Sequence, residues 1–192
     1  MKLYIESLKM HFKSTIEYKT SFILGFLSQF LVFFTYYFII LALFSKFSNI
    51  KGFTVYEVLL TFSIINFGYS TNEFLARGID TFDNLIIDGS FDRILLRPRN
   101  ILLSVLCSNI NFVKISRILQ SIIVFIIAIS NLDINWNITR IICLVLMFIS
   151  SIIVFFSIFL LMASYCFLTV QALEVRNIFT DGGKNIAKYP MG

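Results

Sequence analysis

The side chains of this chain that could do chemistry are concentrated in residues 77–98, RGIDTFDNLIIDGSFDRILLRP. This stretch carries four of the eleven acidic residues, three arginines and one of the two prolines in a chain that is otherwise mostly apolar. Arginines and aromatic rings are typical of surfaces that bind proteins. We therefore predict that it docks a soluble partner. Its charged residues are Arg77, Asp80, Asp83, Asp88, Asp92, Arg93 and Arg97.

Other reactive groups are scattered. Cys107, Cys143 and Cys166 form no C-x-x-C pair, and His11 is the only histidine, so a zinc site is not expected. Cys143 and Cys166 lie in apolar runs and are interpreted as small hydrophobic residues. The apolar segments offer no paired carboxylates and no activated nucleophile, so a membrane enzyme is disfavoured.

Residues 181–184, DGGK, resemble part of a phosphate-binding loop. Ile178 stands where the first glycine of that loop belongs, and Asn185 stands where a hydroxyl is needed. We therefore predict no ATP site and no cofactor in this chain. If the protein performs active work, the energy must come from another subunit.

The composition indicates a membrane protein. Of 192 residues, 58% are hydrophobic and only 14% are charged, whereas soluble domains carry about 25% charged residues. The net charge of +5 includes no basic run of the kind that binds nucleic acid. Heavy use of isoleucine, phenylalanine, asparagine and lysine suggests an AT-rich bacterial genome.

Four segments are expected to cross the bilayer as helices, since a crossing needs about 20 mostly apolar residues. Two of them lie in charge-free runs, 20–45 and 141–173. The other two carry charges only near their ends, where long side chains can reach the interface. The predicted fold is an all-α polytopic membrane helix bundle. Its spans are residues 22–44, 55–74, 115–132 and 141–161.

The first 20 residues differ from these spans. Leu3, Ile5, Leu8, Phe12 and Ile16 recur at helical spacing with lysines and glutamates between them. This pattern predicts an amphipathic helix that lies in the membrane surface. A cleavable signal peptide is a poor alternative, because the apolar run is too long and no small-residue cleavage site follows.

The distribution of lysine and arginine predicts the orientation. With the N-terminus in the cytoplasm, thirteen basic residues lie inside and three (Lys46, Lys51 and Arg140) lie outside. We therefore expect residues 77–99, called the polar segment below, and residues 174–192 to be cytoplasmic. The expected location is a bacterial plasma (inner) membrane.

Helical spacing within the polar segment puts Ile79, Phe82, Leu85 and Ile86 on one face, with Asp80, Asp83, Asn84 and Asp88 opposite. This predicts a short amphipathic helix ended by Gly89, because glycine readily adopts the left-handed conformation of a helix terminus. A second short element, 91–96, is expected to stop before Pro98. Phe82 and Phe91 are the predicted aromatic anchors. A loop that only tethers two spans is the alternative.

Uncharged polar residues also occur inside the spans. The simpler interpretation is hydrogen bonding between helices, and the alternative is a pathway for an amphiphilic substrate. The residues are Thr35, Tyr36, Tyr37, Ser63, Asn66, Gln120, Ser121, Ser150, Ser151 and Ser157.

The pattern Gly-x-Phe-Asp-x-x-Leu-x-Arg-Pro, from Gly89 to Pro98, resembles the cytoplasmic loop of type-2 ABC transporter permeases. Residues 77–80 and 82–83 fit the same family, as do residues 176–179 and 182–183. The resemblance implies an ATPase-coupling helix in the polar segment, a separate cytoplasmic ABC ATPase and a second permease subunit, identical or different. The coupling residues it implies are Asp80, Phe82, Asp83, Gly89, Phe91, Asp92, Arg93, Leu96, Arg97 and Pro98.

The resemblance also implies export, for which an apolar lining suits a hydrophobic or amphiphilic substrate. Family members have six spans, so we expect this chain to lack the last two. The rival hypothesis is a non-transport membrane anchor or assembly protein that recruits another soluble partner through the polar segment.

Overall fold

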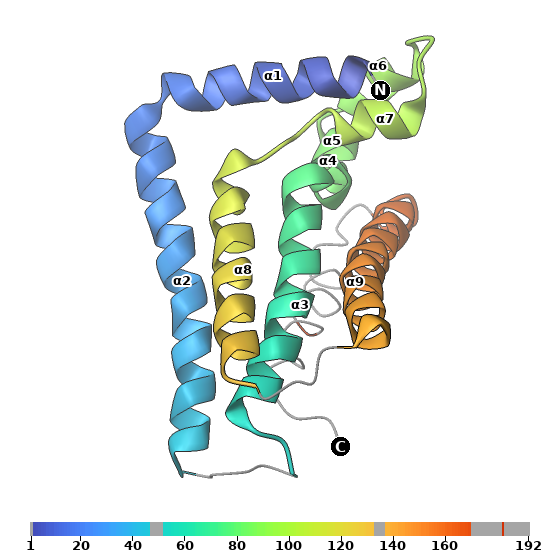
Figure 1. Cartoon of the computed structure of the whole chain (residues 1–192). Helices are drawn as coiled ribbons and strands as arrows, with labels where there is room; N and C mark the ends of the chain where they lie inside the picture. The colour runs from blue at the N-terminus through green and yellow to red at the C-terminus, as the bar shows by residue number, and fades with distance from the viewer. Residues whose placement is uncertain (1, 47–51, 133–136, 170–181, 183–192) are drawn as a thin grey trace.

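The computed structural model describes residues 2–46, 52–132, 137–169 and 182, and it confirms the all-α prediction. Four long helices lie side by side in the order α2, α8, α3, α9 (Figure 1). The described part of the chain contains no strand. Its helices are α1 (Lys2–Glu17), α2 (Lys19–Lys46), α3 (Val55–Leu75), α4 (Arg77–Asp80), α5 (Phe82–Ile87), α6 (Ser90–Leu95), α7 (Ile101–Leu106), η1 (Phe112–Lys114), α8 (Ile115–Ser130) and α9 (Ile138–Tyr165).

Each predicted span coincides with one of the four long helices. Within the described ranges, three segments are long and apolar enough to cross a membrane: Lys19–Lys46, Phe112–Ser130 and Ile138–Tyr165. The fourth, α3, has 21 residues and therefore the length of a span. It is less apolar because it is the central helix, packed against both α8 and α9. The predicted segment 174–192 lies outside the described residues, apart from Gly182.

Polar residues on α3 are buried against its neighbours. Asn72 Nδ2 donates to the Ile152 carbonyl oxygen of α9 at 2.8 Å, and Ser151 Oγ of α9 donates to the Ile64 carbonyl oxygen at 3.2 Å. These two bonds join the helices, as expected for polar groups in a membrane bundle. Ser63 and Ser121, in contrast, donate to carbonyl groups of their own helices.

Local sequence explains where the helices begin. Thr54 and Glu57 form a capping box at the start of α3, in which the Thr54 N–H donates to Glu57 Oε2 at 2.8 Å. The Asn100 side chain accepts from the Leu103 N–H at the start of α7. Asn111 accepts from the Val113 N–H at the start of η1.

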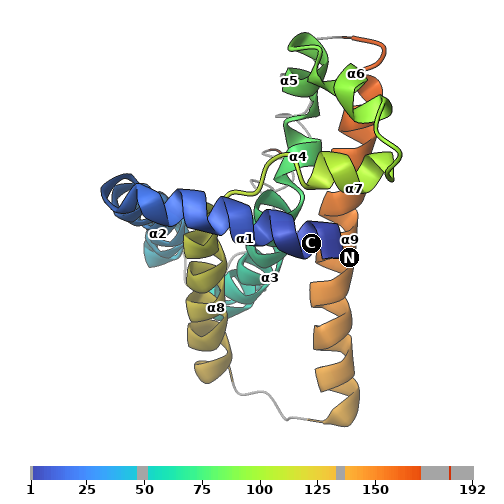
Figure 2. The ribbon, with the colours of Figure 1, turned by 90° about the horizontal axis from the view of Figure 1, so that it is seen from above.

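The N-terminal helix α1 lies across one end of the bundle, as Figures 1 and 2 show. The Tyr4 hydroxyl donates to the Leu75 carbonyl oxygen at 2.8 Å, and Ser7 Oγ donates to the Cys107 carbonyl oxygen at 2.9 Å. Met10 and Phe12 are exposed on the same helix. The structure thus shows a crosswise helix with exposed apolar side chains, and its position in the membrane surface stays a prediction.

Candidate functional site

The polar segment and residues 100–114 join α3 to α8 at the same end of the bundle as α1 (Figure 1). The structure divides the predicted amphipathic helix into α4 and α5, with Thr81 between them. Gly89 ends α5 with a φ of 64°, the left-handed conformation that the sequence predicts. The predicted element at 91–96 is α6, Ser90–Leu95.

The aromatic rings of the polar segment face inward. Phe82 is buried and packs edge-on against Phe91, with ring centroids 4.9 Å apart. Phe167, just beyond α9, packs against both rings, at 5.4 Å from Phe82 and 5.7 Å from Phe91. The two pairs that involve Phe91 have the edge-to-face geometry that aromatic pairs favour, and the Phe82–Phe167 pair is tilted. Phe82 and Phe91 therefore attach the segment to α9.

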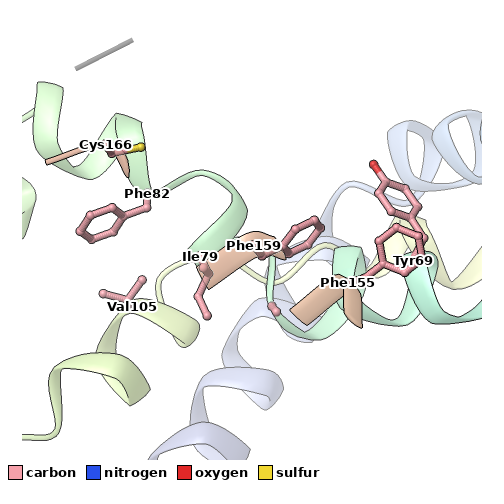
Figure 3. Close-up of a cluster of buried hydrophobic side chains, with 8 residues drawn as sticks. Tyr69, Ile79, Phe82, Val105, Phe155, Phe159 and Cys166 are labelled. Carbon is pink, nitrogen blue, oxygen red and sulfur yellow. The ribbon is translucent and has the colours of Figure 1, made fainter. Parts of the chain in front are cut away.

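A buried cluster continues this contact into the bundle (Figure 3). From the polar segment it includes Ile79 of α4 and Phe82 of α5. From the rest of the bundle it includes Val105 of α7, Phe155 and Phe159 of α9, and Cys166, which follows α9. Tyr69 of α3 packs on Phe155 and Phe159, at ring distances of 5.4 and 6.2 Å. One continuous apolar core thus connects the polar segment to α3, α7 and α9.

Gly78 permits the close approach of α4 and α7. A Cβ atom at this position would overlap the backbone carbonyl oxygen of Val105 and lie 2.7 Å from Ser108 Oγ. Only a residue without a side chain fits here, because the backbone of α7 cannot move aside as a flexible side chain could.

Asp83 lies on the inner side of the segment, although the helical spacing predicts it on a polar outer face. Its residue is only 3% exposed, and neither carboxylate oxygen has a hydrogen-bond partner among the described residues. Burial of an unpartnered carboxylate is costly, and each such group in a native fold needs an explanation.

The outer side of the segment presents a surface of mixed character. Leu96 is 85% exposed, more than any other large hydrophobic residue in the described ranges. The Asp88–Gly89 turn and the charged residues Asp92, Arg93 and Arg97 are also exposed. We call this exposed surface the rim, and it consists of Asp88, Gly89, Asp92, Arg93, Leu96, Arg97 and Pro98.

A buried ionic cluster anchors the inner end of the segment. Glu73, with a side chain only 4% exposed, accepts from Lys114 at 2.9 Å and from Arg117. Arg77 contacts Glu73 at 3.5 Å and also pairs with Asp80. The cluster links α3, α4 and the start of α8, three elements that meet at the base of the polar segment.

The sequence does not predict this cluster, because Glu73, Lys114 and Arg117 near the ends of their spans are expected to reach the interface. They point into the protein instead. Glu73 ends one predicted span and the two basic residues begin the next, so they share one depth in an antiparallel pair. The opposite charges at these facing span ends are the feature of the sequence that could have predicted the cluster. In the described part of the chain, no three His, Cys, Asp or Glu side chains are placed to hold a metal ion.

Comparison with known families agrees with this geometry. A family model described as "ABC-2 family transporter protein" matches residues 30–192, which include the polar segment, α3, α8, α9 and the part of α2 from residue 30 onward. The chain belongs to the ABC-2 transporter family. This confirms the resemblance to type-2 ABC permeases. The ABC-2 protein is thus a multi-pass membrane permease component that associates with an ABC ATPase.

No curated protein and no solved structure matches the chain. The roles of individual residues in this ABC-2 permease therefore have to be inferred from its own contacts.

Proposed function

We propose that the rim is the surface on which the ATPase subunit docks, and that the polar segment carries the ATPase's movement into the bundle. The supporting observation is that the two sides of the polar segment differ in exposure. Leu96 is almost fully exposed on the outer side, while Phe82 on the inner side is buried against Phe91 and Phe167. A segment that is packed against the bundle on its inner side, and that presents an exposed apolar residue among charged ones on its outer side, is suited to transmit a push.

The ten coupling residues fall into two groups in this proposal. Gly89, Asp92, Arg93, Leu96, Arg97 and Pro98 lie on the rim and contact the ATPase. Asp80, Phe82, Asp83 and Phe91 lie on the inner side. Phe82 and Phe91 fix the segment against Phe167 and Asp80 pairs with Arg77 of the ionic cluster, whereas Asp83 is buried among them without a hydrogen-bond partner in the described residues. The sequence predicts Phe82 and Phe91 as the anchors for the partner. In this proposal Leu96 is the apolar anchor instead, because a residue that binds a partner needs an accessible side chain.

Two routes lead from the rim into the bundle. The aromatic contacts run to Phe167 and the end of α9. The ionic cluster runs through Arg77 to Glu73 of α3 and Lys114 of η1. Packed side chains and ion pairs are contiguous networks of the kind that carry coupling between sites.

We further propose that the complex exports a hydrophobic or amphiphilic substrate, with the N-terminus in the cytoplasm of a bacterium and a second permease completing the pathway. A cavity of about 380 Å³ between α3 and α9 supports the apolar substrate class. Ile64, Ile65, Val154 and Phe155 line it, and the only polar lining residues are Thr61, Ser150 and Ser151. Export itself rests on the family resemblance.

The charge reversal Asp92→Arg tests the docking proposal. Asp92 is exposed at the start of α6 and makes no ion pair within the described ranges. We expect the variant to lose the ATPase on co-purification while its thermal unfolding midpoint stays unchanged. Retention of the ATPase, together with capture of a different soluble partner by the rim, would favour the anchor or assembly function instead.

A further inference from the structure

A polar cavity of about 440 Å³ lies between α1 and the part of the polar segment that follows Gly89. Leu3, Glu6, Ser7 and Met10 of α1 form one side, and residues of α6, α7 and the turns that follow them form the other. Small-molecule sites have volumes of roughly 300–1,000 Å³. The cavity therefore has room for a polar headgroup.

Three guanidinium groups give this cavity a positive lining. Arg93, Arg97 and Arg99 line it together with a single carboxylate, Glu6, so the formal charge is three minus one, or +2. None of the three arginines makes an ion pair with another described residue. Arginine presents its N–H groups as a planar fork that binds phosphate with two parallel hydrogen bonds. A phosphate group is therefore the ligand that the lining suits.

The remaining lining is neutral. Burial raises the pKa of the Cys107 thiol, so the thiol stays protonated at neutral pH and adds no opposing charge. Ser104 of α7 and Ser108, just beyond that helix, also line the cavity with hydroxyl groups. Each of these hydroxyl groups already donates its one hydrogen to a backbone carbonyl oxygen, that of Asn100 or of Val105, so the arginines are the donors available to a phosphate.

An apolar cavity of about 320 Å³ lies on the other side of the contact between α1 and α7. Neighbouring residues separate the two spaces: Leu3 and Cys107 line the polar cavity, whereas Tyr4 and Leu106 line the apolar one. Phe156 of α9 also lines the apolar cavity, which exposes no polar surface. The two cavities thus offer a phosphate site and an apolar site at the level of the surface helix.

We propose that the polar cavity binds the anionic headgroup of a membrane phospholipid and that the apolar cavity receives part of its acyl chain. The cytoplasmic leaflet carries the anionic lipids, and the proposed orientation puts α1 in that leaflet. Arg93 and Arg97 belong to both the rim and the polar cavity. Arg99 lines the cavity but lies outside the rim, so its replacement tests lipid binding separately from docking of the ATPase.

The test measures binding of dioleoyl-phosphatidylglycerol to the purified full chain in detergent, by native mass spectrometry, with dioleoyl-phosphatidylcholine as the neutral-headgroup comparison. Loss of one charge-assisted bond in Arg99→Gln should weaken phosphatidylglycerol binding about tenfold. Lys13→Gln is the matched control. It removes one exposed positive charge from α1 at a residue that does not line the cavity, and it should leave binding within about twofold.

Equal binding of phosphatidylglycerol by Arg99→Gln and the unmodified chain would overturn the proposal, as would equal binding of the two lipids. Inorganic phosphate distinguishes a lipid from a soluble anion. At the concentration of the lipid it should not displace phosphatidylglycerol, because it lacks the acyl chain, and full displacement would contradict the lipid assignment. No ATPase is present in this assay, so its result is independent of the docking proposal.

Discussion

Glu73 of α3 accepts a hydrogen bond from Lys114, 2.9 Å away at the start of the next long helix. Both residues are buried, and Arg117 and Arg77 contact the same carboxylate. A buried charge is tolerated only when it is paired and hydrogen-bonded. The pair therefore fixes α3 against α8 at the base of the polar segment.

Replacement of Glu73 by Gln should destabilise the protein strongly. Removal of one partner leaves the other charges buried without compensation, which costs about 3–5 kcal/mol in comparable pairs. The midpoint of thermal unfolding in detergent measures the effect.

Glu57→Gln is the matched control for this variant, because it makes the same change on the same helix at an exposed residue. Gln can still accept from the Thr54 N–H in the capping box, so the variant loses only a negative charge near the start of α3 and should cost about 0.3–1 kcal/mol. Equal midpoints for the two variants would show that the ionic cluster does not hold the helices together.

Gly78→Ala should separate α4 from α7. Its Cβ meets the Val105 carbonyl oxygen, and overpacking of this kind costs about 1–3 kcal/mol. Gly25→Ala is the comparison, because the nearest atom to its added Cβ is a side-chain carbon of Val113 at 3.4 Å. We expect a lower unfolding midpoint for Gly78→Ala alone. A midpoint as high as that of Gly25→Ala would contradict the close packing.

Asp83→Asn should stabilise the isolated permease by about 1–3 kcal/mol, since it removes a buried carboxylate that has no partner among the described residues. The measurement is again the unfolding midpoint of the purified protein. A clear fall in that midpoint would show that the negative charge is needed for the fold.

The sequence predicts the helices well where their local pattern of apolar and charged residues is strong. Charge-free runs of sufficient length identify α2 and α9, and the alternation of apolar and charged residues identifies α1. Gly89 correctly marks the end of α5, because its left-handed φ is a local property. These features depend on neighbours in the chain and need no tertiary information.

The sequence could not show which face of the polar segment is buried. Helical spacing groups Phe82 with Ile79, but it does not reveal that Phe167, 85 residues later, covers Phe82. For the same reason Asp83 is predicted on an outer face although the structure buries it. Leu96 was one residue of a motif in the sequence and becomes the exposed centre of the rim in the structure.

The proposed docking of the ATPase on the rim is tested most directly by the variant Leu96→Asp. The permease is co-expressed with its ABC ATPase, and the ATPase retained per permease is measured after affinity purification. Asn84→Asp is the control, since it adds the same negative charge to an exposed residue of the same segment outside the rim. Loss of the ATPase from Leu96→Asp, with retention by Asn84→Asp, is the predicted result. Full retention by Leu96→Asp would contradict the proposal that the ATPase docks on this surface.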